Sequence, residues 1–137
     1  MDIQKVLIVE DDAEIRHFIK TYLEMEGYQI IEACNGKEAL NLVHRKKPNL
    51  VVTDLMMPEM DGVEFYKIMK ENNETKAIPI IVLTVKNSFD DIRYAYLIGV
   101  DEYITKPFDP NFLSTKIREL LLSTRKDSSA AHFPHRI

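Results

Sequence analysis

Five short apolar runs rich in β-branched residues alternate along this chain with five segments whose apolar residues recur at helical spacing. The runs predict strands at residues 5–9, 29–33, 50–54, 79–84 and 101–105. Strands that alternate with helices are typical of βαβ units, which set the strands parallel and cover both faces of the sheet. We therefore expect an α/β protein, a doubly wound (βα)5 three-layer sandwich around a five-stranded parallel sheet.

Capping residues mark where the predicted helices begin. Asp12 precedes the first helix and is expected to be its N-cap rather than a metal ligand. Asn35 and Glu38 have the spacing of a capping box at the start of the second helix. Asp109 and Pro110 supply an N-cap and a first helical residue for the last helix.

The length and charge of the chain limit what it can be. At 137 residues it is expected to form one domain, over residues 1–123, followed by a flexible tail or linker stub at residues 124–137. The formal net charge of −4 argues against a nucleic-acid-binding surface. With no apolar signal stretch and no run of membrane-spanning length, we expect a cytoplasmic protein that contacts neither nucleic acid nor membrane. Its single cysteine, Cys34, is expected to be small and buried.

Charged and hydroxyl side chains stand where four of the predicted strands end. They are Glu10, Asp11 and Asp12 after the first strand, Asp54 at the end of the third, Thr84 at the end of the fourth and Lys106 after the fifth. Because the carboxyl ends of parallel strands meet at one edge of the sheet, these groups are expected to lie together, where open α/β folds bind ligands. The alternative is that Asp54 only caps its strand, since aspartate is common where regular structure stops.

The chemistry of this group of side chains points to phosphoryl transfer. Clustered carboxylates raise one another's pKa unless a cation or a lysine offsets their charge. Mg²⁺ suits such a cluster because it prefers oxygen ligands, typically one or two carboxylates with waters and a phosphate oxygen. An aspartate nucleophile, Mg²⁺, a lysine and a hydroxyl are together the groups that accept a phosphoryl group by in-line attack.

Four motifs in order along the chain resemble those of the response regulator receiver domain. They are Val9-Glu10-Asp11-Asp12, Thr53-Asp54-Leu55-Met56-Met57-Pro58-Glu59-Met60-Asp61-Gly62, Leu83-Thr84 and Asp101-Glu102-Tyr103-Ile104-Thr105-Lys106-Pro107-Phe108. The resemblance covers residues 5–122 and implies a flavodoxin-like strand order of 2-1-3-4-5. It also implies a role as the phosphoacceptor of a two-component phosphorelay.

The resemblance implies a role for each residue at the site. Asp54 takes the phosphoryl group from a phosphohistidine, Thr84 hydrogen-bonds the phosphoryl oxygens and Lys106 pairs with them. Tyr103 is the aromatic residue that changes rotamer as the Thr84 hydroxyl moves towards the phosphate. The bond between Lys106 and Pro107 is expected to be cis.

The resemblance also implies a metal site and a phosphodonor. Mg²⁺, for which Mn²⁺ is a substitute, is bound by Asp11, Asp54 and the backbone carbonyl of Met56, and Glu10 holds it through water. The donor is a sensor histidine kinase or a histidine phosphotransfer protein. Val85 stands where the family usually has a small residue, and it is expected to narrow the donor's approach and slow phosphorylation.

By resemblance, the output surface consists of the fourth helix, the fifth strand and the fifth helix. Regulators with a winged-helix DNA-binding domain usually carry paired charges there for dimerisation, whereas Leu97 and Phe112 stand at two of those positions in this chain. An apolar face built from Tyr94, Leu97 and Phe112 is therefore expected to dock an effector protein or domain, with a phosphorylation-dependent homodimer as the alternative.

Two other functions use similar groups and are disfavoured by particular residues. An aspartyl-phosphate phosphatase or phosphotransferase needs a second acid two residues after the nucleophile, and that residue is Met56. A nucleotide or flavin binder of this topology needs a glycine-rich phosphate loop after its first strand, where this chain has three acids. We therefore expect a switch that catalyses its own phosphorylation, with slow autodephosphorylation at most, and not a turnover enzyme.

Overall fold

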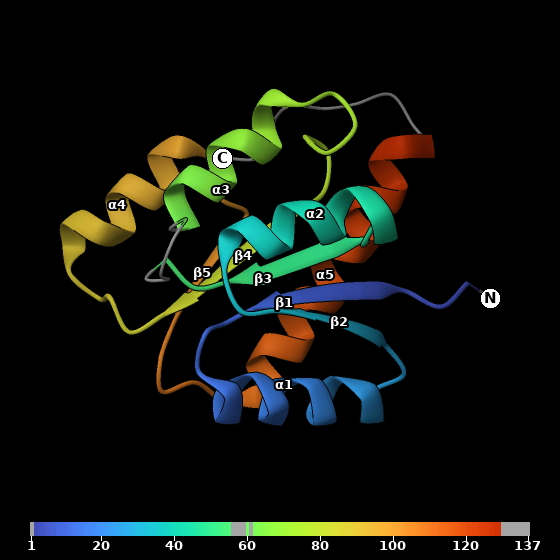
Figure 1. The fold of residues 1–137 in the computed structure, drawn as a ribbon, viewed down its shortest axis with the longest axis horizontal. Helices are drawn as coiled ribbons and strands as arrows, with labels where there is room; N and C mark the ends of the chain where they lie inside the picture. Colours follow the sequence, from blue (N-terminus) through green and yellow to red (C-terminus); the bar gives the residue numbers. More distant parts are fainter. Residues whose placement is uncertain (1, 56–59, 61, 130–137) are drawn as a thin grey trace.

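A parallel sheet covered by helices on both faces makes up the chain over residues 2–55, 60 and 62–129, which the structure, a computed structural model, describes (Figure 1). Its strand order is β2-β1-β3-β4-β5, so the predicted fold class and strand order are confirmed. The strands are β1 (Lys5–Val9), β2 (Gln29–Ala33), β3 (Leu50–Thr53), β4 (Ile80–Thr84) and β5 (Glu102–Thr105). The helices are α1 (Ala13–Met25), α2 (Gly36–Lys46), α3 (Gly62–Glu71), α4 (Phe89–Ile98) and α5 (Pro110–Ser129).

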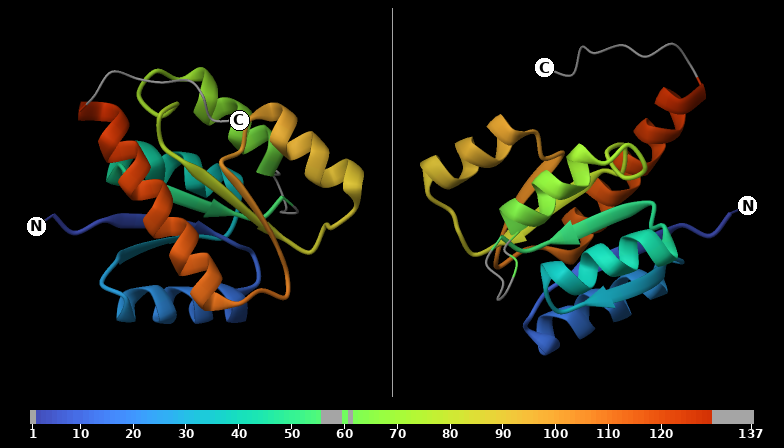
Figure 2. Two further views of the ribbon diagram at one scale, coloured as in Figure 1. Left: turned by 180° about the vertical axis from the view of Figure 1, so that it is seen from behind. Right: turned by 45° about the horizontal axis from the view of Figure 1, so that its top comes forward.

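Two apolar cores lie on opposite faces of the sheet, because successive strand side chains point to opposite sides. Val6 and Ile8 of β1 pack with residues of α1 and α5, whereas Leu7 and Val9 pack with residues of α2, α3 and α4. Figure 1 shows α2, α3 and α4 on one side of the sheet, and Figure 2 shows α5 crossing the other face beside α1. Each fully buried Leu or Ile contributes about 1.5–3 kcal/mol, so burial on both faces holds the strands in place within the sheet.

The register of the strands aligns their carboxyl ends in two pairs, which are offset by two residues because Thr53 of β3 lies beside Val82 of β4. Val9 of β1 lies beside Thr53 of β3, and Thr84 of β4 lies beside Thr105 of β5. The observed strands are one residue shorter than predicted in three places. β3 ends before Asp54, β4 begins after Pro79, which has no N–H for the ladder, and β5 begins after Asp101.

The predicted helix starts are largely confirmed. Asp12 Oδ1 accepts hydrogen bonds from the N–H groups of Glu14 and Ile15, and Asn35 Oδ1 accepts from the Glu38 N–H. Glu38 Oε1 accepts a 2.7 Å hydrogen bond from the N–H of Cys34, one residue earlier than a capping box requires. Cys34 itself is exposed, so the predicted burial is wrong. Ala33 is the last residue of β2 whose side chain lies in the core, and Cys34 follows the end of the strand.

The last helix is longer than the sequence suggested. α5 continues past Thr124 to Ser129, and the flexible tail or linker stub at residues 124–137 stays a prediction. Thr124 Oγ1 donates to the Leu120 carbonyl at 2.9 Å, and the chain has no Pro or Gly between Pro110 and Pro134 to stop the helix. Residues 130–137 lie outside the described residues, and the domain limit at residue 123 stays a prediction. Within the described part of the chain, no helix has the length and apolar character needed to cross a membrane.

Candidate functional site

The residues that end or follow β1, β3, β4 and β5 converge at one edge of the sheet. Glu10, Asp54 and Thr84 are buried there, and Asp11 is exposed. Carboxylate oxygens of Glu10, Asp11 and Asp54 lie within 4.8 Å of one another. Lys106 reaches the same place from the end of β5. The structure thus brings these predicted side chains together, while Met56 lies outside the described residues.

Lys106 lies between two of the acids. Its Nζ is 2.5 Å from Glu10 Oε1 and 2.9 Å from Asp54 Oδ2, and all three side chains are largely buried. Burial acts to lower the pKa of Lys106, but its hydrogen bonds to Glu10 and Asp54 and their charges outweigh burial and raise the pKa. Burial raises the pKa of Glu10, against the opposing effect of the Lys106 hydrogen bond. The lysine therefore stays a cation that offsets part of the negative charge. Its bond to Pro107 is cis, as predicted.

The donor set of this cluster fits a small divalent cation. Mg²⁺ prefers hard oxygen ligands, and it usually combines one or two carboxylates with water. Glu10, Asp11 and Asp54 offer carboxylate oxygens within one small volume. The exposed position of Asp11 leaves the cluster open to solvent.

The loop from β1 to α1 gives its three acids different tasks. Asp12 turns its carboxylate to the helix, where it caps α1 through the hydrogen bonds described above. The Asp12 N–H donates to Glu10 Oε2 at 3.1 Å, which ties the Glu10 side chain back to the loop. Glu10 is therefore held at one oxygen by Asp12 and at the other by Lys106. The interpretation of Asp12 as a cap is confirmed.

The start of α3 packs closely against the backbone of Asp54. A Cβ atom on Gly62 would overlap the carbonyl oxygen of Asp54 and crowd the Cα of Leu55. The Gly62 N–H donates to the Leu55 carbonyl at 3.1 Å, and Thr53 Oγ1 donates to the Asp54 carbonyl at 3.0 Å. Residue 62 therefore needs to be glycine because the two backbones approach so closely.

The hydroxyl of Thr84 and the ring of Tyr103 are connected through Lys86. Thr84 is fully buried, and its Oγ1 accepts a 3.3 Å hydrogen bond from the Lys86 N–H. Tyr103 is 8% exposed, and its hydroxyl donates to the Lys86 carbonyl at 2.7 Å. Burial raises the pKa of Tyr103 to about 12, and the charges of Asp91 and Asp54 act in the same direction. The Lys86 backbone thus lies between the two residues predicted to switch.

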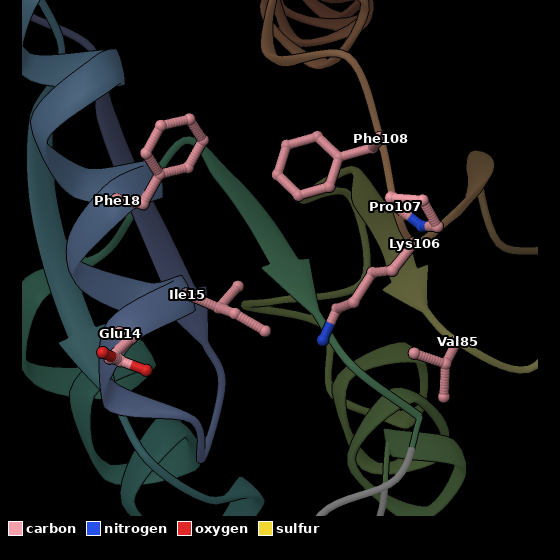
Figure 3. A pocket seen from close by; sticks show the side chains of 7 residues that line it. All are labelled: Glu14, Ile15, Phe18, Val85, Lys106, Pro107 and Phe108. Carbon is pink, nitrogen blue, oxygen red and sulfur yellow. The ribbon is translucent and has the colours of Figure 1, made fainter.

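An apolar pocket of about 460 Å³ opens beside Lys106, between α1 and the chain that follows β5 (Figure 3). It is lined by Glu14, Ile15, Phe18, Val85, Lys106, Pro107 and Phe108. The rings of Phe18 and Phe108 meet edge to face with their centroids 6.5 Å apart. Phe18 is 51% exposed and Val85 57% exposed, so apolar surface faces solvent next to the acid cluster. Val85 lines this pocket, and its effect on phosphorylation stays a prediction.

The sequence prediction missed two contributions to this edge. Arg16 donates from Nη1 to the Glu10 carbonyl at 2.7 Å. A signal for it exists, because Arg16 lies one helical turn after the cap Asp12 and so on the same side of the helix. Phe18 is the other, since an exposed aromatic residue within an apolar helical stripe cannot be told from a core residue by its spacing.

Comparison with known proteins gives consistent matches. The family model described as "Response regulator receiver domain" matches residues 6–118. The protein named "Probable transcriptional regulator ycf27" from Porphyridium aerugineum is 40% identical over 135 residues, which are 98% of this chain and 55% of that protein. "Phosphate regulon transcriptional regulatory protein PhoB" from Pseudomonas aeruginosa is 39% identical over 126 residues, which are 92% of this chain and 55% of that protein. The chain spans about half the length of these curated relatives.

Solved structures give the same match. The receiver domain of the Francisella response regulator 1452 has a TM-score of 0.83 and 36% sequence identity, covering 88% of this chain and 98% of that one. The matched residues of the family model, 6–118, include every side chain that meets at the sheet edge, from Glu10 to Lys106.

Proposed function

This chain belongs to the response regulator receiver domain family, and we propose that Asp54 is the residue through which it acts as a phosphoacceptor in two-component signalling. The observation that carries the proposal is the position of the Asp54 carboxylate. It is buried at the end of β3, 2.9 Å from Lys106 Nζ, and it shares a small volume with Glu10 and Asp11. A carboxylate fixed beside a cation is suited to attack phosphorus, because the cation also offsets the negative charge of the phosphoaspartate that forms.

In the proposed reaction an Asp54 carboxylate oxygen attacks the phosphorus of a phosphohistidine. The oxygen–phosphorus bond forms as the phosphorus–nitrogen bond breaks, and the electron pair of the broken bond leaves with the imidazole nitrogen. Lys106 Nζ, which donates to Asp54 and Glu10, then donates to a phosphoryl oxygen. The Thr84 hydroxyl, at the end of the neighbouring strand β4, is the second donor. Both stabilise the negative charge on the phosphoryl oxygens.

A divalent cation completes the proposed site. Asp11, Asp54 and the Met56 carbonyl would hold Mg²⁺ or Mn²⁺, with Glu10 acting through water, and the ion would offset the charge of the phosphoryl oxygens. Asp11 is the exposed acid of the set and so the first that an entering cation meets. Met56 offers no acid–base group two residues after Asp54. The product is therefore a phosphoaspartate that persists as a signal, which makes the chain a switch and not a turnover enzyme.

The phosphodonor is proposed to approach over the pocket beside Lys106. Its walls are largely apolar, and Phe18 on α1 exposes half of its surface beside Phe108. Figure 3 shows Lys106 extending between Ile15 and Val85, so a partner seated on this pocket would hold its phosphohistidine over the sheet edge. A sensor histidine kinase or a histidine phosphotransfer protein with an apolar contact face fits this surface.

The surface that changes on phosphorylation and contacts the effector is proposed to consist of α4, β5 and α5. A phosphoryl group that draws the Thr84 hydroxyl would disturb the Lys86 backbone and with it the contact of Tyr103. Leu97 on α4 is 71% exposed, and Phe112 on α5 is also exposed, which supports docking of an effector protein or domain. The named relatives are transcriptional regulators, which supports control of transcription through such an effector. A phosphorylation-dependent homodimer through the same face is the alternative.

The phosphoacceptor is tested by intact mass after incubation with acetyl phosphate and Mg²⁺. Wild type should gain one phosphoryl group, whereas Asp54→Asn should gain none, because the carboxamide is not a nucleophile for phosphorus. Asp90→Asn, the same substitution at an exposed residue of α4, is the matched control and should be phosphorylated like wild type. Equal labelling of wild type and Asp54→Asn would contradict the proposal.

The output surface is tested separately. Leu97→Glu and Phe112→Glu each place a charge at an exposed apolar side chain, and neither residue is part of the acid cluster. Both variants should accept the phosphoryl group like wild type and lose phosphorylation-dependent association, measured by light scattering with and without phosphodonor. Unchanged association in both variants would contradict the proposed output surface. It would not affect the proposal that Asp54 is the phosphoacceptor.

A further inference from the structure

Among the residues that the structure describes, no backbone N–H of the sheet donates to the carbonyl of Glu10. β1 ends at Val9, and Glu10 is only 3% exposed. The Glu10 N–H still donates to the Ala33 carbonyl of β2 at 3.0 Å. A buried carbonyl without a donor is costly, because the group loses its water without replacement. Arg16 Nη1 supplies the donor at 2.7 Å, from the first turns of α1.

Arg16 is itself held in place from β2. Its Nε donates to Glu32 Oε1 at 3.1 Å, and the other oxygen, Glu32 Oε2, lies 3.5 Å from Lys20 Nζ. The Arg16 side chain is 20% exposed and that of Glu32 is 35% exposed, so this pair is partly shielded from water. Guanidinium groups hold a fixed fork of donors, which suits one group that must reach two acceptors at once. Arg16 therefore fixes the Glu10 backbone to the neighbouring strand.

This anchor differs from the one that Lys106 provides. Lys106 holds a carboxylate oxygen of Glu10, but in the proposed reaction the lysine turns to the phosphoryl group. Arg16 contacts the backbone of Glu10 and has no such second task. The loop that carries Glu10 and Asp11 would thus keep its position when Lys106 leaves.

We propose that Arg16 is a positioning residue of the acid cluster: by holding the Glu10 carbonyl, it keeps Asp11 where its carboxylate would bind a divalent cation and Glu10 where its carboxylate would hold that cation through water. The inference rests on the proposed function, since it concerns the same cluster. Groups in contact with the ligands of a metal typically change metal affinity about 10–100-fold when they are removed. Arg16 acts at the lower end of that range because it contacts the backbone of Glu10, which would hold the metal only through water.

Charge and positioning predict opposite results, which makes the proposal testable. If Arg16 acted only as a nearby cation, its removal would strengthen Mg²⁺ binding, because one repelling charge would be gone. Glu32, which Arg16 shares with Lys20, offsets part of the guanidinium charge, so this effect is reduced. If Arg16 acts by positioning, its removal weakens Mg²⁺ binding and loosens the loop even in metal-free protein.

The experiment compares Arg16→Met, Arg16→Lys and Glu32→Gln with wild type, and uses Lys20→Met as the matched control. Lys20 lies on the same helix as Arg16 and pairs with the same residue, Glu32 of β2. Arg16 is the residue of the two that contacts the Glu10 carbonyl. The Mg²⁺ dissociation constant is measured by titration of backbone amide NMR signals. Hydrogen exchange at the Asp12 amide, which donates to Glu10 Oε2, is measured without metal.

Arg16→Met should raise the Mg²⁺ dissociation constant about ten-fold and speed exchange at the Asp12 amide. Arg16→Lys, which keeps the charge but loses the fork, should fall between Arg16→Met and wild type, and Glu32→Gln should weaken binding less. Lys20→Met should match wild type in both measurements. Should Arg16→Met not fold, Arg16→Lys and Glu32→Gln decide the question by the same two readouts.

Three outcomes would overturn the inference. The first is that Arg16→Met binds Mg²⁺ as tightly as wild type or more tightly, with unchanged hydrogen exchange at the Asp12 amide. The second is that Arg16→Lys and Glu32→Gln both behave like wild type. The third is that Lys20→Met loses as much Mg²⁺ affinity as Arg16→Met. Absence of any Mg²⁺ response in wild type would instead contradict the proposed metal site. In that case the exchange rate at the Asp12 amide still decides whether Arg16 holds the loop.

Discussion

The Tyr103 hydroxyl donates a 2.7 Å hydrogen bond to the backbone carbonyl of Lys86. The N–H of that same residue donates to Thr84 Oγ1, so one residue of the loop after β4 contacts both the acid-cluster edge and the aromatic side chain of β5. The Tyr103 ring also lies near Tyr96 on α4, with centroids 6.5 Å apart. A continuous series of contacts therefore runs from the edge of the sheet to the helix proposed to carry the output.

Replacing Tyr103 by Phe tests the stability side of this relationship. Tyr103→Phe keeps the buried ring and removes one hydrogen bond, so the free energy of unfolding should fall by about 1 kcal/mol. Urea denaturation monitored by circular dichroism measures this. Tyr94→Phe, at an exposed tyrosine of α4, is the control and should change little. Equal stability of Tyr103→Phe and wild type would mean that the hydrogen bond to Lys86 contributes nothing.

Tyr103 also predicts how stability depends on alkaline pH. Burial raises the pKa of Tyr103 and of Tyr66 from 10.0 to about 12. Between these values the unfolded chain has released the phenol protons that the folded chain still holds, so folding stability falls as pH rises from about 10 to about 12. Below pH 10 the contribution is complete. The raised pKa of Lys106 acts in the same direction.

The measurement is the free energy of unfolding in urea at several pH values between 9 and 12. Tyr103→Phe and Tyr66→Phe should each show a shallower decline than wild type, because each removes one group that binds a proton more tightly when folded. A decline as steep in both variants as in wild type would contradict the assignment.

Asp11→Asn should stabilise the metal-free protein and remove its response to Mg²⁺. Asp11 lies within 4.8 Å of two other carboxylates, and Lys106 contacts those two, Glu10 and Asp54. Removing the Asp11 charge relieves repulsion by about 1 kcal/mol at this exposed position. Melting temperatures in EDTA and in excess Mg²⁺ measure both effects, since a ligand of the folded state raises the melting temperature.

Glu24→Gln, at an exposed residue of α1, is the control for loss of an acid elsewhere. It should keep the stabilisation by Mg²⁺ that Asp11→Asn loses. A variant Asp11→Asn that melts lower than wild type in EDTA would show that Asp11 makes a favourable contact outweighing its repulsion.

The fold could be predicted because its determinants are local and periodic. Runs such as residues 50–52 are apolar on both faces, as a central parallel strand requires, and caps such as Asp12 separate the strands from the helices. The edge that gathers Glu10, Asp54, Thr84 and Lys106 then follows from parallel strands alone. The end of α5 could not be predicted, because residues 124–129 are polar and lack the apolar stripe that marks a packed helix.

The contacts within the site depend on long side chains, whose direction the sequence does not specify. Lys106 was expected to pair with a phosphoryl group, and in the structure it binds Glu10 and Asp54. Arg16 has several rotatable bonds and could as well point into solvent; what selects its conformation is Glu32, sixteen residues away on β2. Pairing of this kind becomes visible only once the strand register is known.

Lys47 adopts a backbone conformation that favours glycine. It caps the C-terminus of α2 with φ 50° and ψ 66°, in the left-handed region. The side chain costs about 1 kcal/mol or more in this region, which glycine avoids. Lys47→Gly should therefore raise the free energy of unfolding by about 0.5–1 kcal/mol despite the greater freedom of glycine in the unfolded chain. Chemical denaturation measures it, and a destabilised variant would show that Lys47 makes a compensating contact.

Two glycines allow strain at the acid cluster to be separated from strain elsewhere. Gly62→Ala places a Cβ against the carbonyl oxygen of Asp54, so either Asp54 or the start of α3 must shift, at a cost of about 1–3 kcal/mol. Gly27→Ala meets no atom within 4 Å but has φ +99°, so it costs about 1–2 kcal/mol through backbone strain alone. The two variants should lose similar stability for different reasons.

Only the glycine beside Asp54 should affect phosphorylation. A displacement of about 1 Å at a reacting group can slow a reaction about a hundred-fold, so Gly62→Ala should take up the phosphoryl group from acetyl phosphate at least ten-fold more slowly than wild type. Gly27→Ala, at the far end of α1, should be phosphorylated at the wild-type rate. Intact mass against time gives both rates at a temperature where each variant is folded. If both variants are phosphorylated equally slowly, the slower rate results from lost stability. If Gly62→Ala is slow and Gly27→Ala reacts at the wild-type rate, the phosphorylation rate depends on the position of Asp54.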